Sequence, residues 1–185
     1  MLREIFNVNN EFETKVLNIT VEDILEKLHS LGAKEHNEVL LRRYVFDMSN
    51  ESIEWIRLRI NGEKTTLTYK SKVRNSTKIG ETIEIETEVS DFETTAQILL
   101  KVPFQKVFYQ ENKSQTFEFN DLEFAIVTWP MLPTYLEVES SSEEKVKRGL
   151  RLLNLEGQDA GDKDMVELYH EHGIDVHSIK ELRFE

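Results

Sequence analysis

The stretch that decides the fold is residues 54–72, EWIRLRINGEKTTLTYKSK. Asn61-Gly62 is a strong signal for a tight hairpin turn, and the segments on both sides of it alternate apolar with polar or charged residues. Because successive side chains of a strand point to opposite faces, Arg57 and Arg59 share one face. The stretch therefore predicts an antiparallel hairpin with one apolar and one cationic face.

The same alternation recurs elsewhere in the chain. Ionised side chains lie two residues apart in Glu11, Glu13 and Lys15, in Lys70 and Lys72, in Glu84, Glu86 and Glu88, and in Glu137 and Glu139. If these faces line the inside of a curled sheet, they form a polar channel with carboxylates for a hard metal ion and cations for a polyphosphate. The alternative is an ordinary solvent-facing sheet surface, on which Glu and Lys commonly mix. The pattern alone leaves both open.

Hairpins dominate the connections, so the predicted class is α+β with a mainly antiparallel sheet. We expect one domain over residues 1–185, with residues 158–185 as a C-terminal helical tail docked on the body. Helices are predicted at residues 20–31, after residue 90, at 142–154 and at 163–172. Beyond the hairpin and the charged segments, strands are predicted at residues 40–47, 106–110, 115–119 and 122–128.

Composition restricts the class of protein. No apolar run approaches the roughly 18 residues needed to cross a bilayer, and no signal peptide is visible. The chain has no Cys, which excludes disulfides and thiolate metal sites, and a cytoplasmic protein is expected. The net charge of −12 should repel nucleic acid and anionic membranes at long range. The local reversal of sign over residues 57–78, which carry seven Lys or Arg against one Glu, is therefore notable.

The charged residues suit a triphosphate. Such a group carries about three to four negative charges, which calls for several fixed cations and a divalent ion. Arg suits phosphate because its planar fork reaches two oxygens at once, and Mg²⁺ and Mn²⁺ prefer oxygen ligands. The candidate phosphate ligands are Lys15, Arg57, Arg59, Lys70 and Lys72, with Lys106 and Lys113 from the second half. The candidate metal ligands are Glu11, Glu13, Glu84, Glu86, Glu137 and Glu139.

An ordered set of motifs resembles a known family. Glu11-Phe12-Glu13-Thr14-Lys15 resembles the ExExK signature of CYTH domains, the triphosphate tunnel metalloenzymes that include class IV adenylate cyclases, thiamine triphosphatases and inorganic triphosphatases. The agreement continues, in the family's order, at Tyr44 to Asp47, Arg57-Leu58-Arg59, Thr66 to Lys70, Glu84-Ile85-Glu86 and Tyr135 to Glu139. The resemblance covers nearly the whole chain.

The resemblance implies a closed or nearly closed eight-stranded barrel with a charged lumen and helices outside. It implies a catalytic set of Glu11, Glu13, Lys15 and Glu137. Metal ions, Mg²⁺ or Mn²⁺, would be held by Glu11, Glu13, Glu137 and Glu139, with Glu84 and Glu86 lining the lumen. The triphosphate would be bound by Lys15, Arg57, Arg59, Lys70 and Lys113. A homodimer is an expectation for some members of the family.

Three positions depart from the family's pattern. Thr82 and Glu111 stand where many members have a cation, and Val127 stands where an Asp is usual. The first two should reduce the number of cations on the lumen wall. Val127 puts in doubt either a second metal site or the residue that activates the nucleophile.

Two other groups of residues have structural explanations. Of Arg42 and Arg43, only one can face the lumen. Trp129 and Tyr135 could stack on a base, although large aromatic residues more often pack in a core.

Two functions from different classes follow from these residues. The leading hypothesis is a metal-dependent enzyme that acts on ATP, thiamine triphosphate or tripolyphosphate, either by hydrolysis or by cyclisation of ATP to cyclic AMP. The alternative is a catalytically weak module of the same fold that binds a polyphosphate or nucleotide. A nucleic-acid binder ranks third, since only the basic hairpin supports it.

Overall fold

The computed structural model describes residues 9–48, 54–72, 82–161 and 163–185 of the chain. The side chains of residues 9–11, 72, 82 and 83 lie outside the described part. The elements are β1 (Asn9–Val16), α1 (Val21–Leu31), β2 (Lys34–Glu35), β3 (Val39–Asp47), β4 (Glu54–Ile60), β5 (Thr65–Lys72), β6 (Thr82–Val89), α2 (Phe92–Leu99), β7 (Lys106–Phe119), β8 (Leu122–Thr128), β9 (Tyr135–Ser140), α3 (Glu143–Leu152), α4 (Met165–Glu171), the 3-10 helix η1 (Val176–Ser178) and β10 (Glu181–Leu182).

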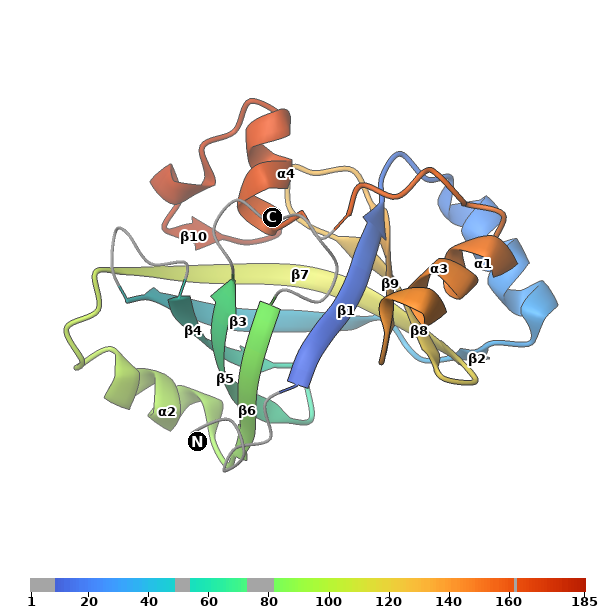
Figure 1. Cartoon of the computed structure of the whole chain (residues 1–185). Coiled ribbons are helices and arrows are strands. Elements are labelled where there is room, and N and C mark those ends of the chain that lie inside the picture. Colours follow the sequence, from blue (N-terminus) through green and yellow to red (C-terminus); the bar gives the residue numbers. More distant parts are fainter. Residues whose placement is uncertain (1–8, 49–53, 73–81, 162) are drawn as a thin grey trace.

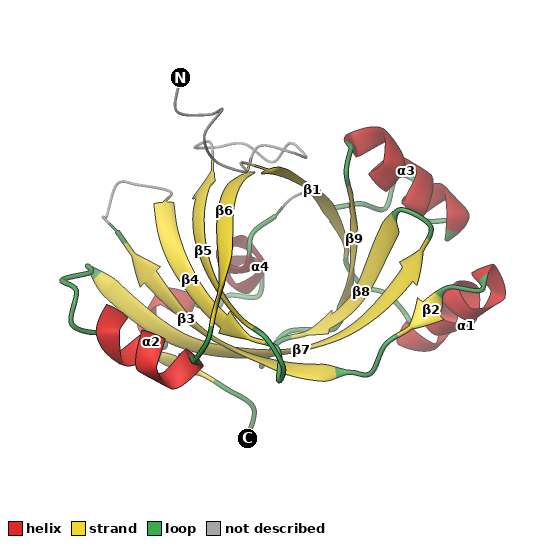
Figure 2. Ribbon diagram, turned by 90° about the horizontal axis from the view of Figure 1, so that it is seen from below, coloured by secondary structure: helices red, strands yellow, loops and turns green. Residues whose placement is uncertain are grey.

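Eight strands form a ring of antiparallel pairs (Figures 1 and 2). The order is β3-β4-β5-β6-β1-β9-β8-β7, and β7 pairs again with β3. The predicted α+β class with a mainly antiparallel barrel is confirmed. The predicted hairpin is β4 and β5, in which Leu58 pairs with Leu67 and Arg59 with Thr66.

One strand prediction is wrong. Residues 106–110 and 115–119 were expected as two strands, but β7 runs without a break through the polar residues 111–114 between them. These residues pair with both neighbours: Asn112 lies opposite Leu41 of β3, and Ser114 lies opposite Val39 of β3 and Val127 of β8. Pairing on both edges outweighs the weak strand propensity of the polar residues. The continuous strand is what closes the barrel.

The apolar faces of the strands point outwards and are covered by helices (Figure 2). One cluster joins α1 and α3 to β1, β7, β8 and β9, with Leu28, Phe124 and Leu136 fully buried. A second cluster joins α2 to the outer face of β3 and β4 through Phe46, Leu58 and Phe92. The hydrophobic core therefore lies between barrel and helices, and the charged faces are left inside.

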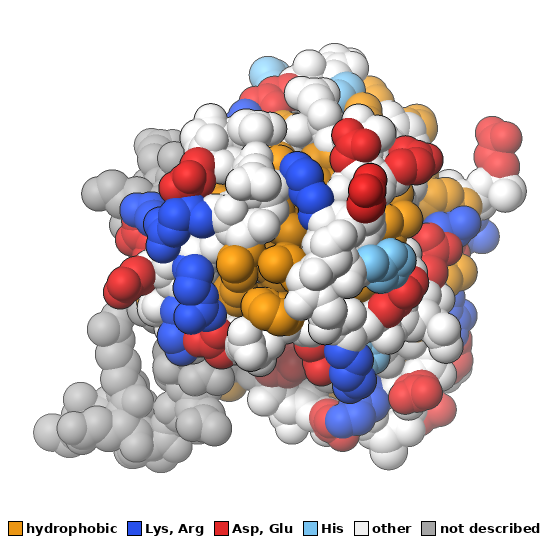
Figure 3. Space-filling model, turned by 90° about the vertical axis from the view of Figure 1, so that its right-hand side faces the viewer, with side chains coloured by type: hydrophobic (Ala, Val, Ile, Leu, Met, Phe, Trp, Pro, Cys, Tyr) orange, Lys and Arg blue, Asp and Glu red, His pale blue; other side chains and the backbone are white. Residues whose placement is uncertain are grey.

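The helix termini differ in how they are capped. Gly32 ends α1 in the left-handed conformation, with φ of 72°. Thr20 is the N-cap of α1, but its side chain makes no capping hydrogen bond. Ser142 caps α3 by accepting a hydrogen bond from the Lys145 amide. On the face that carries α1 and α3, acidic and basic side chains are interspersed (Figure 3).

The C-terminal segment packs on the barrel. β10 pairs in parallel with β7, and the Tyr169 hydroxyl donates a 2.6 Å hydrogen bond to the Pro130 carbonyl. Leu168 and Val176 join a third cluster with Trp129 and Tyr135. Figure 2 shows α4 behind one end of the barrel. Among the described helices, none is both long and apolar enough to traverse a lipid bilayer.

Candidate active site

A cavity of about 970 Å³ lies within the barrel, and its wall is charged. Ionised residues reach it from the inner faces of the strands, while their apolar neighbours face the helices outside. This orientation decides between the two readings of the alternating pattern, because a solvent-facing sheet would turn the same residues outwards. The predicted residues that line the cavity are Glu13, Lys15, Arg57, Arg59, Lys70, Glu84, Glu86, Glu137 and Glu139, with Lys106.

Arginine side chains gather on the wall formed by β3 and β4. Arg43 lies directly opposite Arg59 in the strand pairing, and Arg57 faces the same cavity. Burial, with Arg57 and Arg59 nearby, holds the pKa of Arg43 well below its usual range. Arg57 has an anionic neighbour, since its Nη2 lies 3.7 Å from Oε2 of Glu86.

Two donors on this wall have no partner among the described groups. The Nε atoms of Arg43 and Arg57 are buried and, within the described part of the chain, find no hydrogen-bond acceptor. A buried N–H without an acceptor carries a free-energy cost of about 1–3 kcal/mol, and more for charged groups. An anion placed in the cavity would satisfy these donors and reduce the repulsion among the guanidinium groups.

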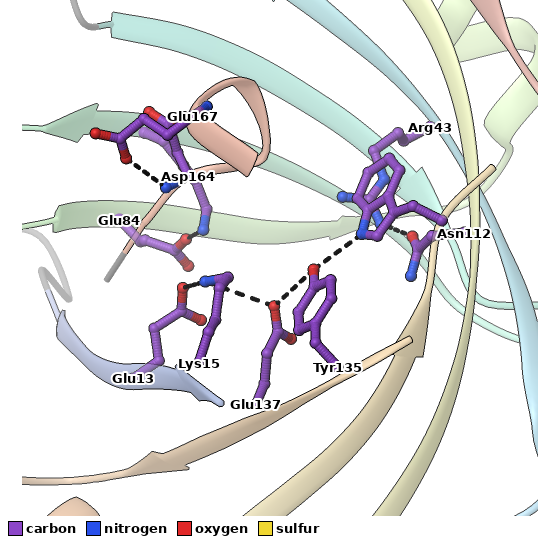
Figure 4. Close-up of polar contacts among 11 residues, drawn as sticks. Glu13, Lys15, Arg43, Glu84, Asn112, Tyr135, Glu137, Asp164 and Glu167 are labelled. Carbon is purple, nitrogen blue, oxygen red and sulfur yellow. Dashed lines mark hydrogen bonds and ion pairs between the residues drawn. The ribbon is translucent and has the colours of Figure 1, made fainter. Parts of the chain in front are cut away.

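Lys15 lies between two carboxylates on the opposite wall (Figure 4). Its Nζ is 2.7 Å from Oε1 of Glu13 and 3.6 Å from Oε1 of Glu137, which lies opposite it on β9. Burial lowers the pKa of Lys15, but the two carboxylates raise it by more, so that it stands well above its ordinary value. Lys15 is therefore a permanently charged donor at neutral pH.

Lys70 and Glu84 form a cross-strand ion pair between β5 and β6. The side chain of Lys70 is 10% exposed and that of Glu84 18%, so the pair lies inside the barrel. Next to it, Oε2 of Glu86 accepts a 2.7 Å hydrogen bond from the Thr68 hydroxyl. This edge of the cavity thus carries both signs of charge.

Lys113 does not join these cations. It lies on the outer face of β7, and its Nζ is 5.1 Å from the centre of the Phe184 ring. The inward positions beside it are Asn112, which contacts Arg43, and Ser114, which lines the cavity. Two separate strands were expected here, but the unbroken β7 keeps its odd-numbered residues outside.

In this register, the departures from the family's pattern at 111 and 127 have structural explanations that differ from those expected. Glu111 also faces outwards, where it accepts hydrogen bonds from the Tyr109 hydroxyl at 2.8 Å and the Phe184 amide at 3.2 Å. A cation at position 111 would therefore also point away from the lumen. Val127 is buried in the cluster with Trp129 and Leu168, so its position is filled by packing. Thr82, Glu11 and Lys72 have side chains outside the described residues.

Three site residues were not selected from the sequence. Arg43 lines the cavity, and its guanidinium carbon lies 4.7 Å from the centre of the Trp129 ring. Tyr135 accepts a 3.0 Å hydrogen bond from Nε1 of Trp129, and its hydroxyl lies 3.4 Å from Oε1 of Glu137 (Figure 4). The signal for Arg43 was available: Tyr44 and Phe46 are the apolar, outward positions of β3, which leaves 43 to face inwards.

The donor chemistry of the site suits a hard divalent cation. Glu13 and Glu137 supply carboxylate oxygens within reach of the same Lys15 ammonium, and such oxygens are the ligands that Mg²⁺ and Mn²⁺ prefer. Among the described side chains, no three acidic or histidine groups are already gathered closely enough to hold a metal. The third carboxylate of the motif, Glu11, belongs to the part whose side chain is not described.

The chain is similar to known proteins in sequence and in fold. A family model described as CYTH domain matches residues 9–164. A solved structure of a protein from Pyrococcus horikoshii OT3 is 25% identical, with a TM-score of 0.72 over 85% of this chain and 98% of that chain. Among curated proteins, none matches the sequence significantly.

Two further solved structures share the fold. An adenylate cyclase candidate from Vibrio parahaemolyticus is 9% identical, with a TM-score of 0.71 over 88% of this chain and 98% of that chain. An adenylyl cyclase candidate from Hippeastrum, described as having a dominant triphosphatase activity, is 15% identical, with a TM-score of 0.56 over 88% of this chain and 96% of that chain.

Proposed function

Because the chain belongs to the CYTH domain family, we propose that it is a metal-dependent enzyme that acts on the triphosphate group of an organic or inorganic triphosphate. The observation that supports this most strongly is the arginine wall. Arg43, Arg57 and Arg59 repel one another inside a cavity, and two of their Nε atoms are buried without an acceptor among the described groups. A polyphosphate is the ligand whose charge and many oxygens match this arrangement.

The protein's own groups have separable tasks. The three guanidinium groups bind and orient the phosphate chain from one side. Lys15, charged at neutral pH, donates hydrogen bonds to a phosphate oxygen from the other side and remains tied to Glu13. Holding a flexible chain in one register is itself a large part of catalysis, because it removes the entropic cost of alignment.

Glu13 and Glu137, together with Glu11, would hold Mg²⁺ or Mn²⁺, and Glu139, Glu84 and Glu86 are further candidates along the wall. Such an ion neutralises phosphate charge and activates water when bound.

The reaction is tested by identifying products. The purified protein is incubated with ATP, thiamine triphosphate or tripolyphosphate, each with Mg²⁺ or Mn²⁺. Orthophosphate release indicates hydrolysis, whereas cyclic AMP and pyrophosphate indicate attack of the ribose hydroxyl on the α-phosphorus. We expect turnover of at least one substrate that disappears with Glu137→Gln. Absence of turnover with all of them would contradict the enzyme proposal.

A binding module of the same fold is the second candidate. Val127 favours it, because an inward position of β8 is apolar and covered by the C-terminal segment instead of carrying a carboxylate. This alternative predicts tight binding of a triphosphate without product. A metal-dependent turnover that is lost in Glu137→Gln would exclude it.

A further inference from the structure

The phenol of Tyr135 connects the hydrophobic cluster behind the cavity with the carboxylate of Glu137. Tyr135 is 3% exposed and lies two residues before Glu137 on β9, so the two side chains share the inner face. Its hydroxyl lies 3.0 Å from Nε1 of Trp129 on one side and 3.4 Å from Oε1 of Glu137 on the other (Figure 4). The phenol thus contacts both a residue of the hydrophobic cluster and a charged residue of the cavity.

The direction of these hydrogen bonds follows from the chemistry of the partners. An indole N–H can only donate, so the Tyr135 oxygen must accept from Trp129. The phenol has one hydrogen, and Oε1 of Glu137 is an acceptor on its other side. An unperturbed phenol, with a pKa of about 10, is protonated at neutral pH, so the Tyr135 hydroxyl donates to Glu137.

Trp129 is itself held in place from two sides. It is 5% exposed and packs in the cluster with Leu168 and Val176 of the C-terminal segment. On its cavity side, the guanidinium of Arg43 lies 4.7 Å from the centre of the ring. The position of the phenol is therefore determined by groups on β3 and in the C-terminal segment as well as by its own strand.

We infer that Tyr135 is a positioning residue for Glu137: its hydroxyl fixes the carboxylate in the orientation in which Oε1 faces Lys15. This inference rests on the proposed function, in which Glu137 serves a divalent ion. Oε1 of Glu137 receives the phenol on one side and has the Lys15 ammonium at 3.6 Å on the other. Without the phenol, the carboxylate keeps its charge but loses one of the contacts that orient it.

The same contacts tie Glu137 to the arginine wall. From Arg43 through Trp129 and Tyr135, adjacent groups cross the cavity's edge to Glu137. A phosphate held by Arg43 and an ion held by Glu137 would then share one rigid support. Hydrogen bonds that orient a metal ligand from behind are worth roughly 10- to 100-fold in metal affinity or activity.

The test compares Tyr135→Phe with a matched control. Tyr109→Phe also removes a phenol that donates to the glutamate two residues later on its own strand, at 2.8 Å to Oε1 of Glu111, but neither residue lines the cavity. The Mn²⁺ dissociation constant is measured by calorimetry without substrate, and kcat and KM are measured on the triphosphate that the wild type turns over. We expect Tyr135→Phe to weaken Mn²⁺ binding and lower kcat by roughly 10- to 100-fold, with the substrate KM little changed. Tyr109→Phe should leave Mn²⁺ binding and kcat unchanged.

A second variant keeps the inference testable if Tyr135→Phe does not fold. Trp129→Phe removes the donor to the phenol and retains an aromatic ring, so it should shift Mn²⁺ affinity and kcat in the same direction by less. If the wild type is active and the folded variants have unchanged Mn²⁺ affinity and unchanged kcat, the positioning role alone is overturned. A wild type that neither binds Mn²⁺ nor turns over any triphosphate would overturn the proposed function, and the positioning role with it.

Discussion

Arg42 and Arg43 are adjacent in β3, yet their guanidinium groups lie on opposite sides of the barrel wall. That of Arg42 lies 5.2 Å from the centre of the Phe92 ring, on the side of α2, and that of Arg43 lies 4.7 Å from the centre of the Trp129 ring, at the cavity. The two residues carry the same charge, so they form a natural pair of test and control. Only the inward arginine contributes to the anion-binding wall that we propose.

Arg43→Gln should therefore weaken triphosphate binding, and Arg42→Gln should not. Hydrogen bonds to charged groups contribute about 1.5–3 kcal/mol, which corresponds to roughly 10- to 100-fold in the dissociation constant. Tripolyphosphate affinity, measured by calorimetry at one fixed salt concentration, gives the comparison. Equal loss in both variants would mean that Arg43 acts only through overall charge.

Lys113 and Arg43 show how much of the site can be predicted from the sequence. Where a strand alternates without interruption, as in β4 and β9, a period of two places Arg57, Arg59 and Glu137 on the inner face. In β7 the polar residues 111–114 suggested a break in the strand. After a break, the period of two no longer relates the side-chain orientation of Lys113 to that of the residues before it. Strand continuity there depends on pairing with β3 and β8, which are distant in sequence. Local propensity carries no information about those partners.

Tyr135 and Trp129 could not be assigned for a different reason. Each was judged on its type, and a large aromatic residue is most often core packing, which is also what both do. The indole N–H of Trp129, which directly follows β8, meets the Tyr135 hydroxyl of β9 because these two strands are paired. Hydrogen bonds between neighbouring strands depend on register, which periodicity alone does not provide.

Gly149→Ala should destabilise the protein, although this substitution normally stabilises a helix interior. A Cβ at position 149 would lie 2.7 Å from Cγ1 of Val138, which is fully buried on β9. Overpacking of this kind costs about 1–3 kcal/mol, which exceeds the gain of about 1 kcal/mol from helix propensity. Urea denaturation of Gly149→Ala, with the exposed Lys147→Ala on the same helix as control, measures it. A more stable Gly149→Ala would show that α3 can move away from β9.

The C-terminal segment should influence the cavity through Trp129 and Tyr135. Leu168→Ala removes a side chain that packs in their cluster, and Leu28→Ala removes an equally buried one from the cluster under α1. Each substitution should cost about 2–5 kcal/mol of unfolding free energy. At a temperature at which both variants are folded, only Leu168→Ala should also lower kcat/KM. A similar effect of Leu28→Ala on kcat/KM would indicate general loosening instead.

Asp121 provides a pH test of how α3 is attached to the barrel. Hydrogen bonds from Lys145 and Arg148 lower the pKa of this exposed carboxyl to about 2. A carboxyl whose pKa is depressed in the folded state stabilises that state above its ordinary pKa and loses the effect as pH falls through the depressed value. Asp121→Asn should therefore lower Tm slightly at pH 7, with a difference that shrinks between about pH 4 and pH 2. A Tm difference that is still complete at pH 2 would contradict this origin.

In the proposed function, a triphosphate binds to the inward cations of the barrel. Calorimetric titration of tripolyphosphate into the wild type, Arg57→Gln and Lys113→Gln tests this binding, because each variant removes one positive charge and, of the two residues, Arg57 faces the cavity and Lys113 does not. We predict that Lys113→Gln binds as the wild type does and that Arg57→Gln binds at least about 10-fold more weakly. Absence of binding to the wild type, or equal weakening in both variants, would contradict the claim.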